Sequence, residues 1–179
     1  MELIKLFIIG ATGYLLLGFY DLAIVCDKPL LRKFLFVSFF ITAVPYLVVF
    51  LTWQSPLGAA MVWTLRILVF LFTLLLVYSV LLEIPLRAKI PGKLYREGTY
   101  GFSRHPGFIW YTVINLLIVI YYWDCGIVLL CAGFTVCNLA LIVVEDMVLF
   151  PKMFPEYGEY RKHTPFFISL RYSKRRRSL

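Results

Sequence analysis

Two polar segments of this 179-residue chain carry side chains suited to binding a ligand. The first contains Arg104, His105 and Pro106 and runs directly into an apolar stretch. Because proline is tolerated in the first turn of a helix, His105 is expected near a helix N-terminus, where free N–H groups favour a carboxylate or phosphate. Arg104 adds a fixed positive charge with bidentate geometry. This segment therefore predicts a binding site for an anionic group.

The second segment begins at two adjacent carboxylates, Glu145 and Asp146, which lie between apolar runs. Ionisable groups in such a place are expensive and are candidate sites by default. The pair offers acceptors for ribose hydroxyls and attracts a cationic centre; the alternative is that it only neutralises the basic loop around Arg104. Aromatic residues that can stack on a flat ring accompany both segments: Tyr100, Phe108, Trp110, Tyr157 and Tyr160. S-adenosylmethionine, with its carboxylate, ribose, aromatic base and positive centre, would use all of these groups.

The composition indicates which kind of fold must position the two segments. The chain is 61% hydrophobic and 16% charged, with a mean hydropathy of +0.85, whereas an average soluble domain is about 45–50% apolar and about 25% charged. These values exclude a soluble enzyme and a disordered tail, and they favour an all-α, polytopic membrane helix bundle. In such a chain the net charge of +8 indicates cytoplasmic loops and anionic lipid, with no nucleic-acid partner.

Five apolar stretches are long enough to be membrane spans: roughly 3–25, 34–53, 62–84, 107–123 and 125–150. The last two are separated by so few residues that they must form a tight hairpin. The hairpin brings the two polar segments to the same membrane face, although about forty residues separate them. We expect a single membrane domain over 1–179, with three spans in 1–84, a ligand-binding loop, hairpin and closing segment in 85–169, and a basic tail in 170–179.

The distribution of Lys and Arg predicts the orientation of the bundle. Basic residues occur in the first and third connections and in the tail, while the second and fourth connections have none. Since cytoplasmic loops carry the excess of positive charge, the N-terminus is expected outside and the C-terminus in the cytosol. We therefore expect an integral membrane protein of a bacterial or archaeal inner membrane or of the endoplasmic reticulum, with its site facing the cytosol. The residues concerned are Lys28, Arg32, Lys33, Arg87, Lys89, Lys93, Arg96, Arg104 and the tail after 150.

Other polar residues near the predicted spans have less specific interpretations. Arg66 is expected to extend its charged end to the outer interface. Asp21 and Glu83 either pair with nearby Lys or Arg or line a cavity that opens to the cytoplasm. The four cysteines and two histidines show no metal-ligand spacing, so no metal is expected and the cysteines are interpreted as small apolar side chains. The basic tail is expected to contact anionic membrane lipids.

The order of these motifs resembles a known family. Arg104-His105-Pro106-Gly107-Phe108, then Glu145-Asp146, then Glu156-Tyr157 to Tyr160 and Thr164-Pro165 look like the signature of isoprenylcysteine carboxyl methyltransferases and related phospholipid methyltransferases. The resemblance covers about residues 90–169. It implies a five-span bundle whose last hairpin and C-terminal segment bind S-adenosylmethionine from the cytosol, while a lipophilic acceptor enters from the inner leaflet.

Carried over by position, the resemblance implies cofactor-binding roles for Tyr100, Arg104, His105, Pro106, Glu145, Asp146, Tyr157 and Tyr160. Asp146 is then a shortened version of one member of the family's paired Glu. The chain departs from the pattern at Phe108, where the family usually has Tyr, at Trp110, where a small residue is common, and at Met153-Phe154, which replaces the usual Phe-Gly.

The expected activity is methyl transfer from S-adenosylmethionine to an isoprenylcysteine carboxylate-like group, a phospholipid amine or a thiol. Such a displacement depends on positioning and a preorganised field, so no catalytic residue of the protein is required, although Glu145 could serve as a base for an amine. Two alternatives are a membrane oxidoreductase similar to sterol reductases and a non-enzymatic small membrane adaptor or transporter subunit.

Overall fold

The computed structural model describes residues 2–88 and 93–168, and in these ranges every regular element is helical. The α-helices are α1 (Glu2–Val25), α2 (Pro29–Leu35), α3 (Ser38–Thr52), α4 (Ala59–Val77), α5 (Glu83–Arg87), α6 (Pro106–Tyr122), α7 (Cys125–Val144), α8 (Phe150–Met153) and α9 (Tyr157–His163). A 3-10 turn, η2 (Gly98–Gly101), lies between α5 and α6. Lys89 and the tail 170–179, to which the sequence assigned cytoplasmic and lipid contacts, lie outside the described residues.

Four helical stretches are long and apolar enough to cross a membrane: Glu2–Val25, Pro29–Thr52, Ala59–Arg87 and Cys125–Met153. The all-helical membrane class predicted from composition is therefore supported. The remaining predicted span, 107–123, corresponds to α6, which has 17 residues, somewhat fewer than the roughly 20 that a span needs. Five spans and their orientation stay predictions.

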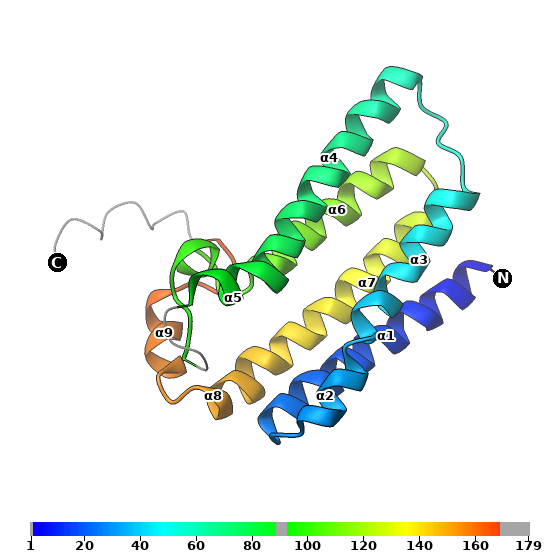
Figure 1. Cartoon of the computed structure of the whole chain (residues 1–179). Helices are drawn as coiled ribbons and strands as arrows, with labels where there is room; N and C mark the ends of the chain where they lie inside the picture. Colours follow the sequence, from blue (N-terminus) through cyan, green and yellow to red (C-terminus); the bar gives the residue numbers. More distant parts are fainter. Residues whose placement is uncertain (1, 89–92, 169–179) are drawn as a thin grey trace, which may run out of the picture.

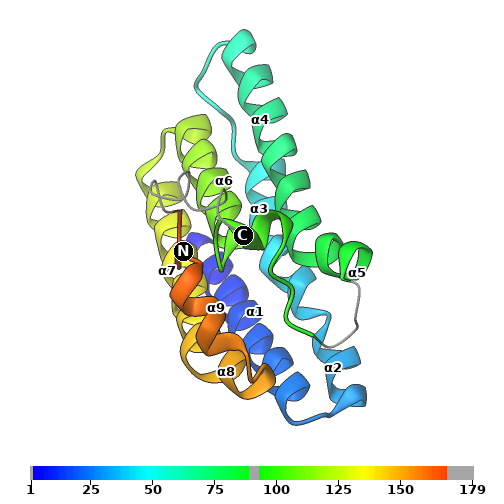
Figure 2. The ribbon, with the colours of Figure 1, turned by 90° about the vertical axis from the view of Figure 1, so that its left-hand side faces the viewer.

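The long helices lie lengthwise beside one another, and the two polar segments share one end of the bundle (Figure 1). Helix α1 packs against α3 and α7, and α6 packs against α4 and α7. Figures 1 and 2 show α5, α8 and α9 together at one end, whereas the α3–α4 and α6–α7 connections lie at the other. The hairpin expected from the short 123–126 connection is therefore present, because α6 ends at Tyr122 and α7 begins at Cys125.

Small residues and interhelical hydrogen bonds hold the bundle together. A Cβ atom on Gly13 would lie 2.9 Å from the backbone nitrogen of Thr42, so only glycine permits this approach of α1 to α3. Between α3 and α6, the Tyr46 hydroxyl is hydrogen-bonded to the Tyr111 hydroxyl and donates to Asn115 Oδ1 at 2.9 Å. Such polar contacts replace the hydrophobic effect that lipid does not supply.

Arg66 and two of the four cysteines differ from what the sequence predicts. Arg66 lies two turns into α4. Its Nε donates to the Tyr121 hydroxyl at 3.1 Å, and its guanidinium lies 5.3 Å from the centre of the Trp63 ring. It therefore has a partner on α6 as well as an exposed position. Cys131 is buried, as expected for a small apolar side chain, but Cys26 and Cys125 are exposed because each lies at a helix end.

Gly13→Ala is expected to destabilise the bundle, because the added methyl group must displace the backbone of α3. Gly18→Ala is the matched control on the same helix, where the nearest atom to an added Cβ is 3.6 Å away. Both variants gain the same helix propensity, so the difference between their free energies of unfolding reports the α1–α3 contact. We expect Gly13→Ala to be less stable by about 1–3 kcal/mol in detergent unfolding; equal stabilities would contradict this packing.

Candidate functional site

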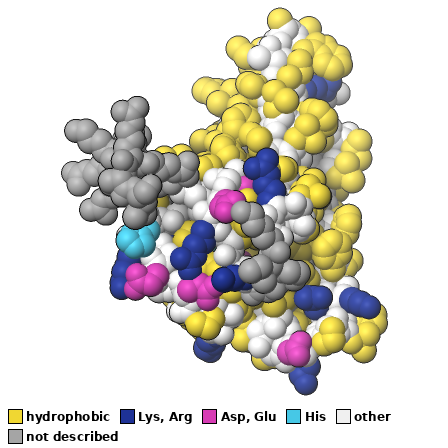
Figure 3. Space-filling view, turned by 60° about the vertical axis from the view of Figure 1, so that its left-hand side comes forward, with side chains coloured by type: hydrophobic (Ala, Val, Ile, Leu, Met, Phe, Trp, Pro, Cys, Tyr) yellow, Lys and Arg dark blue, Asp and Glu magenta, His cyan; other side chains and the backbone are white. Residues whose placement is uncertain are grey.

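The site residues come from η2, the start of α6, the turn that continues α7, and α9, which meet at the polar end of the bundle. His105 is the N-cap of α6 and Pro106 its first residue, as expected for proline in a first turn. Glu145 and Asp146 begin a π-helical turn, η3 (Glu145–Leu149), that continues α7. Such turns often occur at functional sites. Tyr157 and Tyr160 lie on α9, and charged side chains gather at this end while apolar ones cover much of the bundle side (Figure 3).

Asp146 is the centre of the cluster. Its side chain is 2% exposed and forms an ion pair with Arg104, whose Nη1 lies 2.8 Å from Oδ1 and 2.9 Å from Oδ2. The Tyr157 hydroxyl donates to Oδ1 at 2.6 Å, and Arg161 Nε lies 3.6 Å from Oδ2. Asp146 thus neutralises the basic loop, which is one of the two roles considered for the acidic pair.

His105 is buried in the same cluster, with Nε2 at 3.3 Å from Asp146 Oδ1. Its ring stacks on Phe150 and contacts Phe166, with centroid distances of 5.9 and 4.8 Å. Burial lowers the pKa of His105 to about 4, although the hydrogen bond with Asp146 opposes this shift. The imidazole is therefore neutral at neutral pH.

Glu145 has different neighbours from Asp146. Its Oε2 lies 3.8 Å from Nδ1 of His105, and its carboxyl group interacts with that of Asp21 from α1. Within residues 2–88 and 93–168, neither Asp21 nor Glu83 has Lys or Arg at ion-pair distance. The ion pairs with Lys or Arg proposed for these two residues are thus not found in that part of the chain.

The aromatic residues predicted to stack on a ligand pack on other aromatic rings of the protein. Tyr157 is 1% exposed and packs on Phe150 and Tyr160, while Phe108 stacks on Phe167. Trp110 packs between Phe72 and Phe102. Burial, together with the hydrogen bond to Asp146, raises the pKa of Tyr157 above its usual range, so its hydroxyl stays a donor. These rings therefore form the framework of the site.

Two further contacts tie the closing segment to the loop before α6. The backbone N–H of Arg104 donates to the carbonyl of Pro165 at 3.0 Å, and Ser103 Oγ donates to that of Phe166 at 3.1 Å. The Tyr160 hydroxyl donates to the carbonyl of Tyr100 at 2.7 Å. Arg104 Nε is buried and has no hydrogen-bond partner among the described residues. All eight predicted site residues thus lie in one connected region, which retains a free guanidinium donor.

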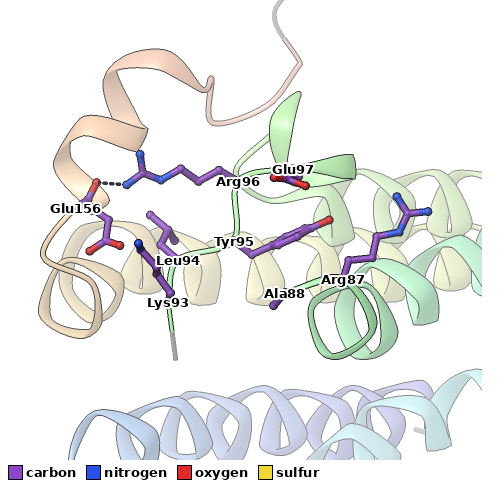
Figure 4. A pocket seen from close by; sticks show the side chains of 8 residues that line it. All are labelled: Arg87, Ala88, Lys93, Leu94, Tyr95, Arg96, Glu97 and Glu156. Carbon is purple, nitrogen blue, oxygen red and sulfur yellow. Dashed lines mark hydrogen bonds between the residues drawn. The ribbon is translucent and has the colours of Figure 1, made fainter. Parts of the chain in front are cut away.

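An open cavity of about 580 Å³ lies beside this region, and the sequence interpretation missed it (Figure 4). It is joined to the cluster through Glu156, which precedes α9 and whose carbonyl accepts a hydrogen bond from Arg96 Nη2 at 3.2 Å. The signal for this cavity in the sequence is the basic run before α6, which by itself indicates only the orientation of the bundle. The lining residues are Arg87, Ala88, Lys93, Leu94, Tyr95, Arg96, Glu97 and Glu156, none of them among the eight predicted.

Comparisons with protein-family models, with curated proteins and with solved structures find no match to this chain. In the described part of the chain no three His, Cys, Asp or Glu side chains are grouped so as to hold a metal ion.

Asp146→Asn is expected to lower the free energy of unfolding by about 3–5 kcal/mol, because it leaves the buried Arg104 charge without its counter-ion. Tyr157→Phe removes one hydrogen bond to the same carboxylate and is expected to cost about 1–3 kcal/mol. Chemical unfolding in detergent measures both. An Asp146→Asn variant no less stable than Tyr157→Phe would contradict the central place given to the ion pair.

His105 predicts a specific dependence of stability on pH. An unfolded chain binds a proton at the ordinary histidine pKa of 6.5, whereas the folded protein binds it only at about 4. Between these values the unfolded state holds more protons, so stability is complete above pH 6.5 and declines as the pH falls toward 4. A His105→Gln variant should show a shallower decline over this range in thermal unfolding. Parallel curves for the two proteins would refute the assignment to His105.

Proposed function

We propose that this protein is an integral-membrane methyltransferase that moves the methyl group of S-adenosylmethionine to a lipophilic acceptor at the cytoplasmic leaflet. The acceptor is an isoprenylcysteine carboxylate-like group, a phospholipid amine or a thiol. In this proposal α6 is the fourth of five spans and the polar end of the bundle faces the cytosol. The observation that carries it is the position of the Arg104–Asp146 cluster next to a cavity of about 580 Å³ at one end of an apolar bundle.

The cavity and its lining fit the proposed cofactor. A volume of about 580 Å³ lies within the usual range of small-molecule pockets, about 300–1,000 Å³. Arg87, Lys93 and Arg96 provide cations for a carboxylate, while Glu97 and Glu156 provide acceptors for an ammonium group or ribose hydroxyls (Figure 4). A lining that carries both positively and negatively charged side chains suits a zwitterionic amino-acid group better than a simple anion.

The chain's own residues would bind and orient the reactants, since the bound cofactor supplies an electrophilic methyl group on a sulfonium. His105, with its pKa lowered to about 4, adds no positive charge that would repel a sulfonium. In this proposal Glu145, which is partly buried beside His105, would take the proton from an amine acceptor. A carboxylate or thiolate acceptor needs no base.

The lipophilic acceptor is favoured by the surface of the bundle. Large apolar side chains are exposed along α1, α3 and α4, among them Ile8, Leu47 and Phe70. An apolar surface of this extent is compatible with acyl chains and requires lipid around it. A lipid-linked acceptor diffusing in the same bilayer would reach the polar end without leaving the membrane.

Calorimetry with S-adenosylhomocysteine tests the proposal on the full, detergent-purified chain. Saturable binding is expected, and Arg96→Ala should weaken it by roughly tenfold through loss of a charge-assisted contact. Lys152→Ala, which removes an exposed cation from α8 outside the cavity, is the matched control and should bind normally. Absence of binding at saturating ligand would overturn the proposal.

Two further measurements distinguish the other functions. A nicotinamide cofactor that binds where S-adenosylhomocysteine does not would favour the oxidoreductase, and failure of both ligands to bind would favour an adaptor or transporter subunit. Transfer of a labelled methyl group to total lipid extract, compared with transfer to a prenylcysteine analogue, would then identify the acceptor class.

A further inference from the structure

Glu83 is a buried carboxylate that neither the cluster nor the cavity lining includes. It is the first residue of α5 and is 0% exposed. Burial of a carboxylate is costly unless it is hydrogen-bonded or paired with a cation. Because Glu83 has no ion pair within the described ranges, its hydrogen bonds must offset that cost.

All the hydrogen-bond partners recorded for Glu83 belong to one short segment, the loop 95–101. The backbone N–H of Thr99 donates to Oε1 at 2.8 Å, and the Thr99 hydroxyl donates to Oε2. The Tyr95 hydroxyl lies 3.5 Å from Oε1. A single side chain at the end of the Ala59–Arg87 helical stretch therefore binds both oxygens to the loop.

The conformation of the loop is matched to this carboxylate. Gly98 has a φ of +56°, which side chains other than glycine rarely adopt. A Cβ atom at Gly98 would lie 1.8 Å from Glu83 Oε1, so the approach also requires the absence of a side chain. A second attachment comes from the π-helical turn η1 (Tyr78–Leu82), where the carbonyl of Ser79 accepts a hydrogen bond from the Tyr100 hydroxyl at 3.0 Å.

The loop in turn supports both parts of the candidate site. Tyr95, Arg96 and Glu97 form part of the cavity wall (Figure 4). The carbonyl of Tyr100 accepts the hydrogen bond from Tyr160 on α9. A shift of the loop would therefore alter the cavity and loosen the contact with α9.

We propose that Glu83 is a positioning residue, whose buried carboxylate fixes the loop 95–101 and thereby sets the wall of the ligand cavity. This inference rests on the cavity as a ligand site and requires no particular reaction. It assigns Glu83 neither to the lining of a cavity nor to an ion pair with Lys or Arg, the two roles expected from sequence.

Hydrogen exchange on the full chain tests the attachment directly, because the Thr99 amide is protected only while the Glu83 contact is formed. Glu83→Ala should raise exchange in peptides covering 96–102 by roughly tenfold, the effect of losing the acceptor of a buried amide. Glu83→Gln should restore most of the protection, since one amide oxygen can still accept from Thr99. Glu159→Gln makes the same chemical change at an exposed residue of the same end and should have no effect.

If exchange at 96–102 in Glu83→Ala equals that of the wild type, the proposal is overturned. An equal increase in exchange across α6 and α7 would also overturn it, because Glu83 would then stabilise the whole bundle and not the loop. If Glu83→Ala cannot be purified, Thr99→Val, which removes only the hydroxyl donor, decides between the same outcomes with an expected increase of about threefold.

The affinity for S-adenosylhomocysteine separates this proposal from the proposed function. Glu83→Ala should weaken binding by roughly tenfold, with recovery in Glu83→Gln. If the wild-type protein does not bind this ligand, the proposed function fails, while the exchange measurement still decides the role of Glu83. If Glu83→Ala loosens the loop but binds the ligand as tightly as wild type, the positioning role is refuted and the methyltransferase proposal stands.

Discussion

The carboxylate of Asp146 lies where water has almost no access, and the polar end of the molecule is built around it. Without partners such a group would strongly destabilise the fold. It has them because two separate segments converge on it: the adjacent Arg104 and His105 come from the start of α6, and Tyr157 comes from α9. The convergence fixes the closing segment on the α6–α7 hairpin, and the cavity beside it depends on that placement.

Glu83 repeats this arrangement on a smaller scale. Its carboxylate is also buried and also takes its partners from a loop, but those partners are neutral groups of Thr99 and Tyr95. Both carboxylates lie at or next to a π-helical turn, at Glu145–Leu149 and at Tyr78–Leu82. The loop bound by Glu83 and the helix bound by Asp146 are joined by the hydrogen bond from Tyr160 on α9 to the carbonyl of Tyr100.

Many features of the fold could be predicted because they depend on local composition and spacing. The apolar runs predict membrane-spanning helices, and the two-residue connection between Tyr122 and Cys125 forces a hairpin. Proline at position 106 places His105 at a helix N-terminus. Helix α6 is short because its polar flank, from Ser103 to His105, belongs to the preceding loop and its N-cap and not to the helix.

The sequence by itself determined the class of fold, the common end of the two polar segments and the eight residues that meet there, because hydrophobicity and a short hairpin leave few alternatives. Only the tertiary structure decided which partner each charge takes. Asp146 pairs with Arg104 while the adjacent Glu145 lies against His105 and Asp21. The physical reason is that adjacent residues on a helical turn point in different directions. Their partners therefore depend on which distant segments pack there, and local sequence does not encode that packing.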